Sequence, residues 1–238
     1  MRGIICCHFR GGIGATANGL LVFAVIAAVL FLFILRAKPS INRAVVKTIG
    51  ILFLAAIAHD QGGPLPLVLA LLFAAFGDFL LAFDGEKAFQ IGLAGFLLAQ
   101  VALVVLFLRD ASATALWIAE PWRIVLTVIV VAHASRLALI LWRKLPRAMG
   151  GQIVAYALVI TMMGVTALGY ATPPVIFGVM LFILSDTLIA YERFIIEVEV
   201  NQHPWISPTI WGTYFVAQLT ILLGTLSTIS TTAVAVAA

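Results

Sequence analysis

Eight apolar runs, separated by short polar connections, fill almost the whole of this chain. Most of the runs are close to the roughly 20 residues that a helix needs to cross the hydrocarbon core of a bilayer. Only 10% of the residues are charged, whereas soluble domains carry about 25%. The sequence therefore predicts an all-α integral membrane protein with eight transmembrane helices. The predicted helices cover residues 19–35, 45–58, 65–83, 88–108, 121–142, 151–170, 173–194 and 208–229.

The predicted domain organisation has one membrane domain, residues 19–230, because the connections between the runs are too short for a separate soluble domain. A polar, Gly-rich segment, 1–18, precedes this domain, and a short tail, 231–238, follows it. The net charge of +4 does not imply a nucleic-acid partner, because in a membrane protein Lys and Arg chiefly orient the helices. Membrane lipids are the expected surroundings.

Two aspartates interrupt the apolar runs within matching motifs. Asp78 lies in Gly-Asp-Phe-Leu-Leu-Ala-Phe and Asp186 in Ser-Asp-Thr-Leu-Ile-Ala-Tyr, and both motifs follow the pattern small, Asp, any, Leu, aliphatic, Ala, aromatic. An ionisable residue at the centre of a membrane helix costs about 2.5–3.5 kcal/mol on insertion scales, so it marks a functional site by default. The two matched motifs predict one shared pocket.

A second, weaker repeat follows each aspartate motif. The segments 96–100 and 214–218 both run aromatic, two apolar residues, Ala, Gln, and they end at Gln100 and Gln218. Duplicated halves are common in membrane transport folds. The repeat is consistent with two parallel four-helix halves, in which the third and seventh helices are equivalent.

The distribution of Lys and Arg predicts the orientation. If the N-terminus lies outside, the inner connections hold most of the basic residues, as the positive-inside rule requires. The protein is therefore predicted to be a multi-pass protein of a bacterial inner (plasma) membrane, with both termini outside the cytoplasm. In this orientation most of the polar side chains of the helices fall at the cytoplasmic level, which predicts a cytoplasm-facing cavity. The candidate residues that support the aspartates or contact a substrate are Lys38, Lys47, Gln100, Arg136, Tyr156, Ser185, Tyr214 and Gln218.

Each candidate also has a purely structural interpretation. The aspartates could belong to a hydrogen-bonded network, and Tyr and Gln often join membrane helices. Lys38 and Lys47 could meet a phosphate head group, or could orient the helices and contact anionic lipid. Arg136 could pair with Asp or phosphate, or could extend to the interface. Ser185 is interpreted as a small packing residue, because it has no evident His partner.

No metal and no cofactor is predicted. The four histidines are dispersed over different segments and depths, so a metal site lacks its set of ligands. They are His8, His59, His133 and His203.

An ordered series of motifs carries a resemblance to a known family. The series covers roughly residues 20–223 and comprises Lys38-Pro39, Gly77-Asp78-x-x-Leu81, Gly92, Phe96, Tyr156, Met163, Ser185-Asp186-x-x-Ile189-Ala190, Phe194 and Thr213-Tyr214-x-x-Ala217-Gln218. With these residues the chain resembles the YhhN family of lysoplasmalogenase-like membrane proteins.

The resemblance implies an ether hydrolase. Family members with known activity cleave the vinyl ether bond of lysoplasmalogens, which are lysophospholipids, to a fatty aldehyde and a glycerophospho-alcohol. Asp78 and Asp186 match the family's intramembrane acidic positions. The sequence departs from the family at Gln100, because the family commonly has His there.

Two carboxylates suffice for this reaction without a metal. One carboxyl that keeps its proton in a desolvated site would protonate the alkene carbon, and the ionised one would stabilise the resulting cation and orient water. The sequence leaves the assignment of Asp78 and Asp186 to these roles open. The alternative function is a transporter or lipid carrier, in which the paired aspartates would bind protons or cations during alternating access.

Overall fold

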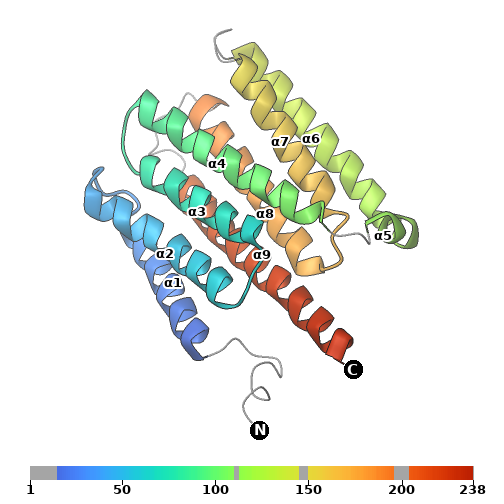
Figure 1. The fold of residues 1–238 in the computed structure, drawn as a ribbon. Coiled ribbons are helices and arrows are strands. Elements are labelled where there is room, and N and C mark those ends of the chain that lie inside the picture. The colour runs from blue at the N-terminus through green and yellow to red at the C-terminus, as the bar shows by residue number, and fades with distance from the viewer. Residues whose placement is uncertain (1–14, 110–112, 145–149, 196–203, 238) are drawn as a thin grey trace.

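The computed structural model describes residues 15–109, 113–144, 150–195 and 204–237. These residues form helices and connections, with no strand among them (Figure 1), which confirms the predicted all-α class. The elements are α1 (Ala15–Ile34), α2 (Ile41–Asp60), α3 (Leu65–Leu80), α4 (Glu86–Phe107), α5 (Ala113–Ala119), α6 (Trp122–Lys144), α7 (Gly150–Ala167), α8 (Pro173–Ala190), the π-helix η2 (Tyr191–Ile195) and α9 (Ile206–Ala237).

Seven of the described helices are long and apolar enough to cross a membrane. The helix in the third predicted span, α3, is apolar but has only 16 residues. It therefore rises about 24 Å, less than the roughly 30 Å of a hydrocarbon core. The predicted count of eight spans is thus not confirmed, although α3 packs between α2 and α4 within the bundle.

Local sequence signals set several helix ends. The Ser40 hydroxyl accepts a 3.3 Å hydrogen bond from the backbone N–H of Arg43, and so caps the start of α2. Proline opens α3 and α8 in their first turns, where its missing N–H costs no hydrogen bond. Gly85 precedes α4 with a φ of 115°, a conformation that glycine adopts without steric penalty.

The last helix is longer than expected. The sequence predicts its end near residue 229 and a tail over 231–238, yet α9 continues to Ala237. Ser and Thr residues end the apolar run, but they do not end the helix. Ser227 and Thr228 donate their hydroxyl protons to carbonyls three residues earlier in α9, so their polar groups are satisfied within the helix.

The packing of the helices repeats between the two halves of the chain. The helices α1, α2, α3 and α4 pack in sequence, and so do α6, α7, α8 and α9. The cross-contacts also correspond, because α4 contacts α7 and α9 contacts α2. The short α5 precedes the second half, and α1 begins and α9 ends at the same end of the bundle, the lower end in Figure 1.

Small residues bring α3 and α4 together beside the first aspartate. A Cβ atom on Gly77 would lie 2.8 Å from the Phe96 ring and 3.0 Å from the Gly92 carbonyl oxygen. A Cβ atom on Gly95 would lie 3.1 Å from the Gly77 backbone nitrogen. The backbones can therefore approach only because these side chains are absent, and this approach fixes the position of Asp78.

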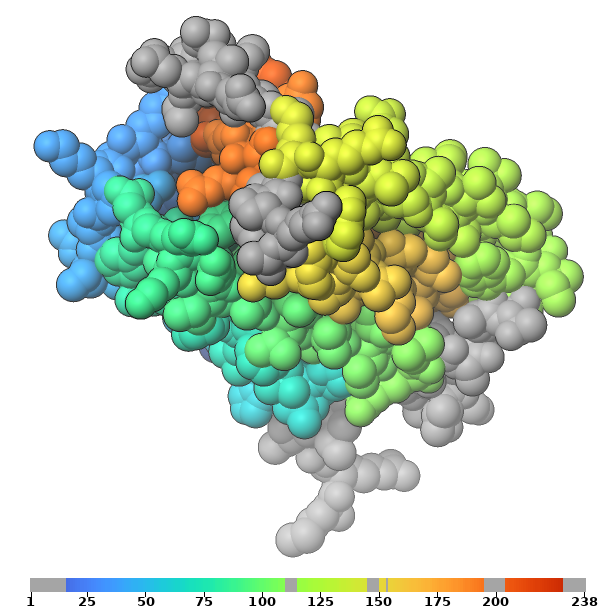
Figure 2. All heavy atoms as spheres, turned by 90° about the horizontal axis from the view of Figure 1, so that it is seen from above, coloured from blue at the N-terminus to red at the C-terminus, as the bar shows by residue number. Residues whose placement is uncertain are grey.

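The pair α6–α7 lies at one side of the bundle, where α7 packs against α4 and α8. Seen from above in Figure 2, its yellow-green and yellow atoms lie to one side of α3 and α4. Only 17% of the α6 span is buried, against 56% of the α9 span. The helix α6 is therefore the least buried of the seven candidate membrane spans.

Candidate functional site

A cavity of about 690 Å³ lies between the two halves of the bundle, and we name it the polar cavity. It is bounded by residues of α1–α4, α8, η2 and α9. Both aspartates line it, so the two motifs that the sequence singled out meet in one space. The charged residues that line it are Arg36, Arg43, Lys47, Asp78, Asp84, Asp186, Glu192 and Arg193.

Asp78 is held by partners from both halves. Its side chain is 1% exposed, and its Oδ1 lies 3.0 Å from Nζ of Lys47 on α2. Its Oδ2 accepts a 2.6 Å hydrogen bond from the hydroxyl of Tyr214 on α9. The Lys47 ammonium also lies 5.9 Å from the ring centroids of Phe31 and Trp211, so the lysine is desolvated on its apolar sides.

Asp186 has neutral partners. Its Oδ2 accepts a 2.7 Å hydrogen bond from the Tyr156 hydroxyl on α7 and a 2.6 Å hydrogen bond from Nε2 of Gln100 on α4. The same Nε2 also lies 3.0 Å from the Tyr156 oxygen. Gln100 is fully buried, and its Oε1 has no hydrogen-bond partner. The polar atoms of Asp186, Tyr156 and Gln100 therefore bond to one another. The acceptors that remain open in this triad are Oε1 of Gln100 and Oδ1 of Asp186.

The two aspartate networks follow the internal repeat. Asp78 takes one partner from the second helix of its own half, Lys47, and one from the fourth helix of the other half, Tyr214. Asp186 likewise takes Tyr156 from the second helix of its half and Gln100 from the fourth helix of the other. Each aspartate thus joins the two halves, but only Asp78 has a cation within ion-pair distance among the described residues.

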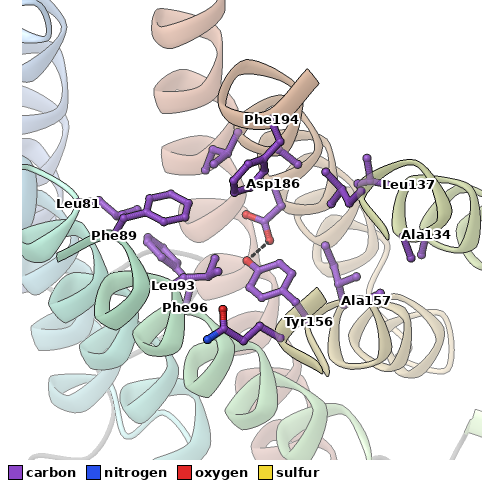
Figure 3. A pocket seen from close by; sticks show the side chains of 16 residues that line it. Leu81, Phe89, Leu93, Phe96, Ala134, Leu137, Tyr156, Ala157, Asp186 and Phe194 are labelled. Carbon is purple, nitrogen blue, oxygen red and sulfur yellow. Dashed lines mark hydrogen bonds between the residues drawn. The ribbon is translucent and has the colours of Figure 1, made fainter. Parts of the chain in front are cut away.

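A second space, of about 100 Å³, adjoins the polar cavity, and we name it the apolar chamber. It lies between α4, α6, α7 and α8, and Figure 3 shows Leu137 and Ala134 facing it across from Phe89. Asp186 stands between these walls with its carboxyl directed at Tyr156. Asp78 does not line this chamber, whereas Asp186 lines both spaces. The residues common to both are Leu81, Phe89, Phe96, Asp186 and Ile189.

The remaining predicted residues divide into two groups. Ser185 lines the polar cavity and donates a 3.1 Å hydrogen bond to the Ile210 carbonyl, which accounts for its hydroxyl. Gln218 is buried one turn after Tyr214 in α9. Lys38 is exposed in the connection between α1 and α2, and Arg136 is exposed on α6. Neither of these two cations lines the polar cavity or the apolar chamber.

Three arginines of the polar cavity, Arg36, Arg43 and Arg193, were not among the predicted site residues. Arg43 donates hydrogen bonds to the carbonyls of Leu35 at 3.0 Å and Ala82 at 2.8 Å, and Arg36 donates to the Pro204 carbonyl at 2.7 Å. These bonds join the ends of helices around the cavity. The one available signal was the spacing of Arg43 and Lys47, because residues four apart share one face of a helix.

Within the described part of the chain, no group of three or more His, Cys, Asp or Glu residues is arranged to hold a metal ion. His8 and His203 lie outside the described residues.

The comparisons with known proteins agree with the motif series. The search among curated proteins and the search among solved structures found no match to this chain. The model of the YhhN family matches residues 42–225, a stretch that contains both aspartates and all four of their hydrogen-bonding partners. The match covers well over half of the chain, and the chain therefore belongs to the YhhN family.

Proposed function

We propose that this protein is a lysoplasmalogenase-like hydrolase, which cleaves the vinyl ether bond of lysoplasmalogens to a fatty aldehyde and a glycerophospho-alcohol. One observation carries the proposal: Asp186 lines both a charged cavity and an apolar chamber. A lysoplasmalogen has its vinyl ether bond at the junction between a polar head and a hydrocarbon chain. The bond to be cleaved therefore belongs where the two spaces meet.

The charges suit such a substrate. The phosphate group of the lipid head would lie in the polar cavity near Arg43 and Lys47, which are one turn apart on α2. An amine of the head group would lie nearer to Asp84 or Glu192, which line the same cavity. The first carbons of the chain would enter the apolar chamber between Phe89 and Leu137.

Asp186 is proposed as the general acid. It faces the chain side of the bond, and the alkene carbon that must receive the proton is the one nearer the chain. Its two neutral donors both bind Oδ2, which leaves Oδ1 to carry and deliver the proton. Protonation of that carbon breaks the C=C π bond and leaves an oxocarbenium ion, while Asp186 becomes a carboxylate.

Asp78 is proposed to act in the second step. Its pairing with Lys47 stabilises the carboxylate form, and a carboxylate in the polar cavity can stabilise the cation and accept a proton from water. Water adds to the oxocarbenium carbon and forms a hemiacetal. The hemiacetal hydroxyl gives its proton to the glycerol oxygen as the hemiacetal collapses to the aldehyde and the glycerol alcohol. The proton that Asp78 accepted from water then passes to Asp186 and restores the acid. One water is consumed for each bond cleaved.

The proposal includes the location of the protein. It would span the inner membrane of a bacterium, with both termini outside the cytoplasm and the polar cavity toward it. The basic residues at the cavity end of the bundle, including Arg36, Arg43 and Arg193, favour this orientation by the positive-inside rule.

The experiment is an assay of the purified protein in detergent with lysoplasmenyl-ethanolamine or lysoplasmenyl-choline. Release of aldehyde is expected, and Asp186→Asn and Asp78→Asn should each abolish it while the helical circular dichroism spectrum persists. The matched control is Asp60→Asn, an exposed aspartate at the end of α2 that lines neither the polar cavity nor the apolar chamber. A lysolipid with a saturated alkyl ether should release nothing. Normal turnover by both site variants would overturn the mechanism.

The repeated halves support the alternative function of a lipid or ion carrier. Each half has one aspartate, which hydrogen bonds to a residue of the other half. A carrier moves its substrate between two compartments and changes no covalent bond. Aldehyde release in detergent, where no second compartment exists, therefore separates the two functions. Uptake of lysolipid into vesicles without aldehyde formation would favour the carrier.

A further inference from the structure

The apolar chamber has four walls and therefore four seams. The helices α4 and α7 pack against each other, as do α6 and α7, so these two seams are closed. The seam between α4 and α8 leads to the polar cavity, because residues of both helices line both spaces. The seam between α6 and α8 remains. At the end of α8, η2 packs against α6, but α6 and α8 themselves are not among the closely packed pairs of the described chain.

The α6/α8 seam is bridged by one side-chain hydrogen bond among the described residues. Nε2 of His133 on α6 lies 2.9 Å from Oγ1 of Thr187 on α8. The Thr187 hydroxyl donates its own proton to the Ile183 carbonyl at 2.7 Å, so His133 must be the donor in this bond. His133 is exposed. Its helix, α6, is the least buried of the seven candidate membrane spans. The bridge therefore lies at the bilayer side of the seam, directly beside Asp186.

Below this bridge the three helices converge tightly. A Cβ atom on Gly164 of α7 would lie 2.8 Å from Val130 on α6 and 3.0 Å from Ile183 on α8. Val130 and Ile183 are both buried. This contact lies one helical turn below Ala134 and Ile160, which line the apolar chamber, so the chain of a bound lipid cannot continue downward between the three helices.

The apolar chamber is too small for a lipid chain. Its volume is about 100 Å³, whereas an apolar cavity of about 150 Å³ is filled by one benzene molecule. Only the first few carbons of a chain fit, and a chain that spans one leaflet is about 15 Å long. Charged residues line the polar cavity together with its apolar residues, which favours the α6/α8 seam as the route for the remaining carbons.

We propose that the α6/α8 seam is a binding slot for the hydrocarbon chain of a single-chain lipid, through which the chain enters from the bilayer and in which its distal part remains. The His133–Thr187 hydrogen bond closes this slot in the empty protein and opens when a chain passes. This proposal rests on the proposed function for the identity of the lipid, but the slot itself concerns binding. It implies that turnover depends little on the length of the chain beyond its first carbons.

A photolabelling experiment tests the slot without any hydrolysis. The probe is a lysophosphoethanolamine with a stable alkyl ether chain and a diazirine at the chain terminus, added to the full-length protein in lipid nanodiscs. Peptide mapping after illumination should find the label on the outer faces of α6 and α8 near His133 and Thr187, and excess unlabelled lysolipid should reduce it at least fivefold. Label confined to the walls of the apolar chamber, or label on α1–α3, would overturn the proposal.

Tethering the seam provides the second test. In a protein with Cys6→Ser and Cys7→Ser, the pair His133→Cys and Thr187→Cys is joined by a short bifunctional thiosulfonate, which reducing agent removes. The tether should lower photolabelling and aldehyde release at least tenfold, and reduction should restore both. Full photolabelling of the tethered protein would contradict the proposal.

The matched control pins α1 to α2 instead, away from the seam. A Cβ atom on Gly50 lies 3.7 Å from Cβ of Ala27, a spacing that suits a disulfide bond, and neither residue lines the polar cavity or the apolar chamber. Oxidation of the pair Ala27→Cys and Gly50→Cys should change neither photolabelling nor turnover by more than twofold. If the untethered protein is labelled on α6 and α8 but releases no aldehyde, the proposed function fails while the slot stands.

Discussion

Nζ of Lys47 lies 3.0 Å from Oδ1 of Asp78, in a contact between α2 and α3 that is almost closed to solvent. The aspartate is 1% exposed and the lysine 14%. Neither charge is stable alone in such a place, because removal of one partner of a buried pair leaves the other uncompensated. The same ion pair therefore stabilises the first half and holds Asp78 in the carboxylate form that its proposed role requires.

The first prediction concerns this pair. Lys47→Met should lower the free energy of unfolding by about 3–5 kcal/mol, because it leaves the Asp78 carboxylate buried without a cation. The double variant Lys47→Met with Asp78→Asn should recover most of this loss, since Tyr214 can still donate to the new amide oxygen. Unfolding in detergent, followed by circular dichroism, measures both. Strictly additive losses would contradict the coupling of Lys47 and Asp78.

The second prediction concerns Gln100, whose Nε2 donates to Oδ2 of Asp186. Gln100→Leu should reduce aldehyde release roughly 10- to 100-fold, because its hydrogen bond stabilises the carboxylate that forms as Asp186 gives up its proton, and a hydrogen bond to a charged group contributes about 1.5–3 kcal/mol. Gln100→His should retain more activity, since an imidazole keeps a donor. The control is Gln90→Leu on the same helix, where the amide bonds only to exposed Glu86. Equal turnover by Gln100→Leu and the wild type would show that Gln100 does not contribute to the reaction.

The third prediction concerns the close approach of α3 and α4. Gly77→Ala should destabilise the protein by about 1–3 kcal/mol, because the new methyl group meets the Phe96 ring at 2.8 Å. Gly212→Ala is the control, since nothing lies within 4 Å of a Cβ atom there, and alanine is the better helix former by about 0.5–1 kcal/mol. The melting temperatures should therefore move in opposite directions. A shift of the same sign and size in both variants would contradict the packing argument.

The fourth prediction separates stability from function. Arg123 is 1% exposed, and its guanidinium donates to the carbonyls of Leu168 at 2.7 Å and Tyr170 at 2.8 Å, near the end of α7. It lines neither the polar cavity nor the apolar chamber. Arg123→Met should cost about 1–3 kcal/mol of stability, because it leaves two buried carbonyl oxygens without their donor, yet leave the kcat of the folded protein unchanged at low temperature.

The control for Arg123 is the exposed Arg136 on the same helix. Arg136→Met should alter the free energy of unfolding by no more than about 0.5 kcal/mol, as surface substitutions usually do. If Arg123→Met loses kcat as well as stability at a temperature where the variant remains folded, the hydrogen bonds of Arg123 must also act on the site.

Much of the site was predictable because membrane burial is costly. A carboxylate, a tyrosine or a glutamine within an apolar run must find a polar partner, and the predicted Lys47, Gln100, Tyr156 and Tyr214 are the partners of the two aspartates. Exposed cations gave a weaker signal. Lys38 and Arg136 carry the same charge as Arg43, but only Arg43 lines the polar cavity.

The apolar chamber was not predictable from the chain. Apart from Gln152, Tyr156 and Asp186, its walls are Leu, Ala, Phe and Ile residues, which are indistinguishable in composition from residues that face lipid. Whether such a residue lines a space depends on how far α6–α7 stands from α8, and this distance is set at Gly164 by its contacts with Val130 and Ile183. Three segments that are distant in sequence come into contact there, so no local sequence pattern predicts the contact.

The sequence by itself determined the helical class, the membrane setting, the family and the pair of aspartates, because the free energy of moving a segment from water to hydrocarbon is a sum over its own residues. The tertiary structure alone decided which partner each aspartate has, and that Asp186 lines the apolar chamber as well as the polar cavity while Asp78 lines only the polar cavity. The reason is that helices in a bilayer select their neighbours by close packing and hydrogen bonding between surfaces. Such contacts depend on pairs of residues far apart in the chain rather than on any single stretch of it.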